Sequence, residues 1–163
     1  MRNKLAVSLT TLVLVVGIGI TSSAARGADD PNSGTWRLNL AKSRFNPGPA
    51  PKAIKVETIK IENDTETYNS ERLDASGTTT LETYSAKLDG TEAPVSGIPY
   101  ADTISTKRLA PNHLVTTFKK DGMVTMTVNI VVAADGMSRT VTYTGKNERG
   151  QKVHSVLVFD KQT

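Results

Sequence analysis

Hydrophobic and polar positions alternate along most of the chain from Gly34 onward. The clearest segment is 123–133, where Val124, Met126, Val128 and Ile130 fall on one face and the intervening residues are mostly polar. A period of two predicts strands with one buried and one exposed face. The segments predicted as strands are 34–40, 53–63, 66–73, 78–88, 91–95, 102–109, 113–120, 123–133, 137–144 and 151–159.

Short turn signals separate these segments. Asp89-Gly90 is the strongest, because this dipeptide favours two-residue hairpins. The remaining turn glycines are Gly77, Gly122, Gly136 and Gly150. Their spacing predicts strands near ten residues, about 30 Å long at ~3.3 Å per residue. A change of apolar phase between Val56 and Ile59 predicts a bulge in that strand.

Long strands joined by tight turns predict an all-β protein. We expect a single antiparallel up-and-down barrel of about 8–10 strands, because closure removes the exposed sheet edges. Little or no helix is expected outside the N-terminal segment, and the proline-rich stretch at 46–51 predicts an extended linker. A β-sandwich is the alternative, although sandwiches usually have longer crossing connections.

The N-terminal segment has the pattern of an export signal. Residues 1–25 contain Arg2 and Lys4, an apolar run of 16 residues from Leu5 to Ile20, and a small-residue stretch at 22–25. A retained membrane anchor is the alternative, but the run is shorter than the roughly 20 residues that span a bilayer. We therefore expect a signal peptide at 1–25, a flexible leader at 26–33 and a β-barrel domain at 34–162. The protein is then periplasmic or secreted, without stable membrane insertion after cleavage.

Charge and cysteine content exclude several classes. The chain has 20 basic and 16 acidic residues, and losing Arg2 and Lys4 leaves a net charge near +2. Without a basic face or an aromatic-interleaved basic run, this predicts no nucleic-acid partner. The absence of cysteine excludes disulfides and thiol chemistry. With only eight aromatic residues, the core must rely on aliphatic side chains and methionine.

Two short motifs carry a family resemblance. Gly34-Thr-Trp36 opens the first strand, and Val158-Phe159-Asp160-Lys161 ends the last one. Together with the meander, they resemble the calycin barrels, which include lipocalins and fatty-acid-binding proteins. The chain also resembles exported bacterial proteins of unknown role with a Gly-Thr-Trp-(Lys/Arg)-Leu-Asn opening, a Pro-Tyr-Ala-Asp loop and a Tyr/Phe-Asp-Lys-Gln ending. Here these motifs are Gly34–Asn39, Pro99–Asp102 and Phe159–Gln162. The resemblance implies an exported lipocalin-like protein that binds a small apolar or amphipathic ligand inside the barrel.

Two departures weaken the functional part of this resemblance. Fatty-acid-binding proteins have two helices after the first strand, where this chain has its proline-rich linker. They hold the ligand carboxylate with an Arg-x-Tyr motif on the last strand, and the matching positions here are Leu157 and Phe159. The resemblance therefore supports the predicted fold more strongly than the predicted function.

A set of aromatic and polar residues could form the ligand site. Trp36 is expected to close one barrel end, and Arg108 would join the tyrosines as polar groups in an apolar cavity if their faces point inward. The alternative places Arg108 in solvent, and a single bulge would invert every such assignment. The candidate ligand-binding residues are Trp36, Tyr68, Tyr84, Arg108, Met126 and Tyr143.

Catalytic and metal signatures are weak. The two histidines, His113 and His154, lack zinc-binding spacing, and the chain has no nucleophile elbow. Six carboxylates could include an acid–base pair, but their Thr and Lys neighbours favour the solvated face. They are Glu57, Glu62, Glu66, Glu71, Glu82 and Asp102. We expect no catalytic residue, no metal and no cofactor. A filled barrel acting as a structural or interaction module, and a hydrolase-type enzyme, remain alternative functions.

Overall fold

The chain forms one closed sheet. The computed structural model describes residues 29–50, 53–73 and 76–163, so the expected signal peptide at 1–25 lies outside the described residues. The ten strands are β1 (Gly34–Leu38), β2 (Ala53–Glu62), β3 (Thr65–Leu73), β4 (Thr79–Lys87), β5 (Asp89–Ser96), β6 (Thr103–Ala110), β7 (His113–Lys120), β8 (Met123–Val132), β9 (Ser138–Lys146) and β10 (Lys152–Gln162).

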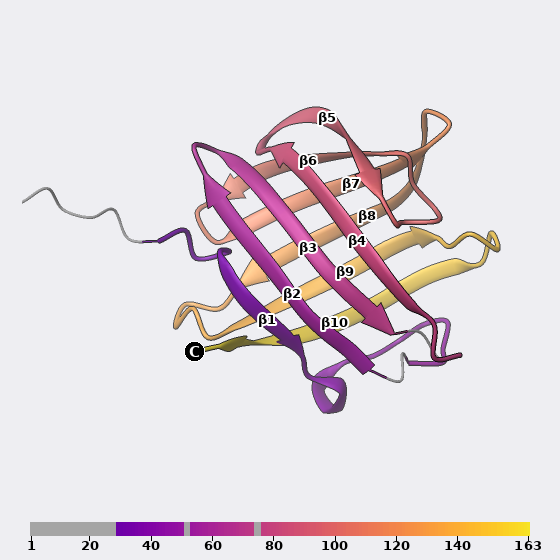
Figure 1. Ribbon diagram of the computed structural model, residues 1–163, viewed down its shortest axis with the longest axis horizontal. Helices are drawn as coiled ribbons and strands as arrows, with labels where there is room; N and C mark the ends of the chain where they lie inside the picture. The colour runs from indigo at the N-terminus through magenta and orange to yellow at the C-terminus, as the bar shows by residue number, and fades with distance from the viewer. Residues whose placement is uncertain (1–28, 51–52, 74–75) are drawn as a thin grey trace, which may run out of the picture.

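Every strand pairs antiparallel with its neighbours in the chain, and β1 pairs with β10 to close the barrel (Figure 1). The predicted all-β, up-and-down barrel is confirmed. Within the described residues the only helix is a three-residue 3-10 turn, η1 (Leu40–Lys42). None of the described helical structure is long and apolar enough to cross a membrane.

Two local features were expected, a bulge and a hairpin, and the structure has both at or beside their predicted positions. The register of β2 against β3 shifts between Ile54 and Glu57, beside the predicted bulge. Leu88, whose side chain is buried, separates β4 from β5, and the pairs Thr83–Ser96 and Tyr84–Val95 centre this hairpin between Asp89 and Gly90, as expected. Asp89 already pairs with Lys107 in β6, so Gly90, with a φ of +93°, lies in the irregular start of β5.

The end of the barrel where β1 starts is closed by side chains; we call it the closed end. Trp36 is fully buried there, and its Nε1 donates to the carbonyl of Asn32 at 3.1 Å. Asp30 accepts a 2.5 Å bond from the Arg108 guanidinium. Of the expected leader, Asp30 and Asn32 thus bond to the barrel, while residues 26–28 lie outside the described residues.

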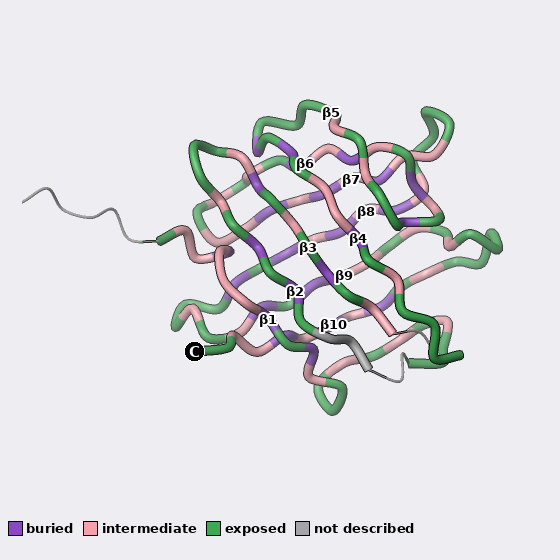
Figure 2. The backbone as a smooth tube through the Cα atoms, viewed as in Figure 1, coloured by how far each residue is buried: buried purple, intermediate pink, exposed green. Residues whose placement is uncertain are grey.

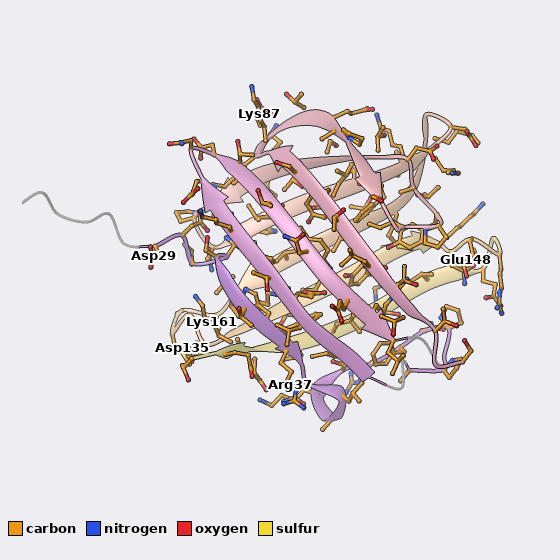
Figure 3. The ribbon with its side chains drawn as sticks, viewed as in Figure 1. Asp29, Arg37, Lys87, Asp135, Glu148 and Lys161 are labelled. Carbon is orange, nitrogen blue, oxygen red and sulfur yellow. The ribbon has the colours of Figure 1, made fainter. Side chains whose placement is uncertain are left out.

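The opposite end is bordered by loops; we call it the open end. The linker after β1, the loop at 97–102 and the β9–β10 hairpin at 147–151 lie there. Backbone bonds between Arg44 and Val156, of 2.7 and 2.9 Å, hold the linker against β10. Glu148 marks this end in Figure 3, and Asp135 and Lys161 mark the closed end. Buried positions alternate with exposed ones along the strands (Figure 2), so the core is the barrel interior.

Candidate functional site

The middle of the barrel interior is charged. Glu57 on β2, Glu66 on β3 and Glu82 on β4 are 5, 1 and 7% exposed. The expectation that these carboxylates lie on the solvated face is wrong. Each has a threonine next to it on the opposite face of its strand, and such neighbours made the segments look like surface. The other three carboxylates, Glu62, Glu71 and Asp102, are exposed as expected.

Glu57 belongs to a buried ion pair. Its Oε2 accepts from Arg139 Nη2 on β9, and its Oε1 accepts from the Tyr68 hydroxyl at 3.0 Å. The guanidinium carbon of Arg139 lies 4.8 Å from the ring centroids of both Trp36 and Phe159. Two aromatic faces and a carboxylate therefore hold this arginine at the floor of the interior.

Glu82 forms a second pair nearer the open end. Its Oε1 lies 2.8 Å from Arg72 Nη2, and the Arg72 side chain is 36% exposed. Burial raises the pKa of both Glu57 and Glu82, and the charges of Arg139 and Arg72 respectively oppose that rise. Both carboxylates thus have a cationic partner.

Glu66 has no such partner among the described residues. Its side chain is 1% exposed, and its Oε2 atom accepts no hydrogen bond. Burial raises its pKa to about 7, although the charge of Arg139 and hydrogen bonds from Tyr84 and Thr106 lower it. A carboxyl of this kind is half ionised near neutral pH, and no local pattern around Glu66 indicates that environment.

Four tyrosines line the interior above these carboxyls. Tyr68 and Tyr84 stack in parallel, with ring centroids 4.7 Å apart and a 9° angle between the planes. Tyr100 meets the Phe118 ring edge-on at 5.7 Å. Burial raises the pKa of Tyr68, Tyr84 and Tyr143, so their hydroxyls stay protonated. They present aromatic faces and neutral hydrogen-bonding groups to the interior.

The interior contains two adjoining spaces. An inner cavity of about 40 Å³ is bounded by Glu66, Arg139 and the Tyr68–Tyr84 stack. A larger cavity of about 410 Å³, which we call the mouth, occupies the open end. The residues lining both are Glu57, Glu82, Tyr100 and Tyr143. Because these four residues line both cavities, the inner cavity and the mouth lie on either side of them.

The candidate ligand-binding residues fall into two groups. Tyr68 and Tyr84 line the inner cavity, Met126 lines the mouth, and Tyr143 lines both. Trp36 and Arg108 lie at the closed end, and neither lines the inner cavity or the mouth. Contact of any of the six with a ligand stays a prediction. Sequence reasoning missed Arg72 and Arg139, and it named Glu57, Glu66 and Glu82 but placed them on the solvated face.

The histidines lie apart from this site. His113 Nε2 is 2.6 Å from Asn129 Oδ1, and His154 is exposed, 3.4 Å from the Thr144 hydroxyl. Across the described ranges, no group of three or more His, Asp or Glu side chains could hold a metal ion.

No protein-family model, curated protein or solved structure matches this chain. The closed ten-strand antiparallel barrel is consistent with a calycin-like barrel. A fold of this kind hosts many functions, so the functional argument rests on the chemistry of the interior.

Proposed function

We propose that this protein is an exported, lipocalin-like binding protein that holds a small apolar or amphipathic molecule at the open end of its barrel. One observation carries the proposal: the mouth has a volume of about 410 Å³. Ligand pockets for small molecules usually fall between about 300 and 1,000 Å³. The charge and hydropathy pattern of residues 1–25 supports export.

The lining of the mouth favours an amphipathic molecule. Its apolar part comes from Phe45, Met126, Val153 and Leu157, contributed by the linker, β8 and β10. Its polar part includes Ser70, Arg72 and Glu82 from β3 and β4. A molecule with an apolar body and one polar group would meet both parts at once.

The competing proposal is a filled barrel that serves as a structural or interaction module. The closed half of the interior favours it, because Trp36, Phe159 and Arg139 fill that half and the inner cavity measures only about 40 Å³. The two proposals differ in what the mouth does, and binding can be measured directly.

The test uses the neutral fluorescent dye N-phenyl-1-naphthylamine with the purified protein. A bound dye in the mouth should gain fluorescence and saturate. Val153→Trp adds a bulky ring to the mouth wall and should weaken binding by about tenfold or more, as expected from lost apolar burial. The matched control, Val131→Trp, places the same ring at a position that is 37% exposed and should bind like wild type.

Absence of saturable dye binding, or equal binding by the two tryptophan variants, would overturn the proposal in favour of a filled module. Native mass spectrometry of the protein as purified adds an independent measurement. A reproducible adduct that is lost in Val153→Trp and kept in Val131→Trp would support the proposal.

A further inference from the structure

We infer that the molecule held in the barrel carries a protonated primary amine, which enters the inner cavity and pairs with Glu66. This inference rests on the proposed function, because it names the chemical class of the ligand for the same interior. The observations behind it are the ion pairs of the buried glutamates, the carboxylate oxygen of Glu66 that accepts no hydrogen bond, the tyrosine faces, and the residues that the inner cavity shares with the mouth.

The buried carboxyls balance the buried arginines only when Glu66 is protonated or is paired with such a group. Three glutamates point into the interior, and two arginines neutralise two of them through the Glu57–Arg139 and Glu82–Arg72 pairs. Glu66 is the glutamate left without an ion pair in the described part of the chain. A buried ionised carboxylate is costly unless it is paired, and one cationic group on a ligand would complete the balance.

Glu66 is placed to receive that group. Its side chain is only 1% exposed, it lines the inner cavity, and its Oε2 accepts no hydrogen bond. The stacked Tyr68 and Tyr84 rings line the same cavity, and aromatic faces attract cations. An ammonium group has three donors, which suit the free carboxylate oxygen and neighbouring hydroxyls. At about 40 Å³ the cavity suits a head of a few atoms.

The remainder of the ligand would lie in the mouth. Tyr100, Tyr143 and Glu82 line both spaces, so a chain attached to the amine would lie between these side chains. The apolar side chains of Met126 and Leu157 then receive that chain. The geometry therefore favours an alkyl or aryl amine whose charged head points inward and whose body points to the open end.

Anionic heads are disfavoured by the same contacts. Arg139 is committed to Glu57 and enclosed by two aromatic rings, and Arg72 is paired with Glu82. The main competing occupant is water, because Arg139 Nε also lacks a hydrogen-bond partner and a cavity of this size has room for about three waters. Water would satisfy Glu66 without conferring any preference among ligands.

The test compares three probes that share a chain and differ in the head: octylamine, octanol and octanoate. Each displaces N-phenyl-1-naphthylamine from the full protein near neutral pH. Octylamine should displace the dye at a concentration at least about tenfold below that of octanol, as a charge-assisted bond predicts. Glu66→Gln should remove most of that preference, so that octylamine and octanol displace the dye at similar concentrations. The matched control, Glu62→Gln, alters a glutamate that pairs with Lys60 on the outer surface and should behave as wild type.

The outcomes separate the two proposals. Dye binding with equal displacement by all three probes, or strongest displacement by octanoate, overturns the amine inference and leaves the binding proposal standing. The amine inference is likewise overturned if no probe displaces bound dye, or if Glu66→Gln keeps the full amine preference. Failure of the dye itself to bind overturns both proposals.

Discussion

Replacing Glu66 by glutamine should make the protein more stable at alkaline pH than the wild type, and the advantage should vanish in acid. Glutamine keeps the size of the side chain and one carbonyl oxygen, and removes the ionisable group. The reason is that folding places a carboxyl, whose pKa is 4.5 when unperturbed, in a site that raises it to about 7. Ionised Glu66 therefore opposes folding.

The magnitude follows from the difference between the two pKa values. A rise from 4.5 to about 7 is some 2.5 units, or about 3 kcal/mol at ~1.4 kcal/mol per unit. The pKa of Glu66 is higher in the folded state than in the unfolded state. The contribution of Glu66 to the stability of the wild-type protein is therefore fully present below about pH 4.5, and it is lost as the pH rises through about 7. The free energy of unfolding of Glu66→Gln, minus that of wild type, should thus increase by about 3 kcal/mol across this window.

Urea denaturation across this pH range measures that difference. Glu57 and Glu82 also have raised pKa values, but they are present in both proteins and largely cancel in the comparison. Glu62→Gln, an exposed substitution, controls for a general effect of removing one negative charge. A difference that stays flat with pH, or that favours wild type at alkaline pH, would refute the reasoning.

Three further outcomes follow from other contacts. Arg139→Met leaves Glu57 buried without its ion pair, and urea denaturation should show a free energy of unfolding lower by about 3–5 kcal/mol. In the same assay, the double variant with Glu57→Gln should recover most of that loss. Gly97→Ala should lower the free energy of unfolding by about 3 kcal/mol, because a Cβ would lie 1.8 Å from the backbone oxygen of Leu81. Gly122 has nearly the same φ but open space around it, so Gly122→Ala should cost only about 1 kcal/mol in the same assay. Arg108→Leu removes an ion pair at the closed end and should leave dye binding unchanged, since Arg108 lines neither cavity.

The fold was predictable because its signals are local. Alternation at period two in the segment around Met126, and glycine at turns such as Gly122, define strands and connections from a few adjacent residues. Closure of the barrel then follows from the need to remove sheet edges. The same reasoning located Tyr68, Tyr84 and Tyr143 as candidates that could face inward together, and the structure does place them around one interior.

The charged layer, which consists of Glu57, Glu66, Glu82, Arg72 and Arg139, was not predictable in this way. Each strand has two faces, and one bulge exchanges them, so alternation alone cannot say whether Glu57 points in or out. Its cationic partner, Arg139, is 82 residues away in sequence, across the barrel. The segment of Glu66 also carries threonine and asparagine on its outer face, which gives a polar average although its inner face is buried.

A purely structural interior would have little reason to contain this layer. Buried ion pairs can often be replaced by apolar residues of similar volume at no cost in stability, and an unpaired buried carboxyl such as Glu66 is a direct cost. Violations of local consistency of this kind are expected where a site has a function. The layer lies beneath the mouth, with Glu82 and Tyr143 lining both spaces, so its position coincides with the route a ligand would take. The cost of burying Glu66 and the proposed preference for an amine therefore have the same physical origin: a buried carboxyl without a cationic partner among the described residues.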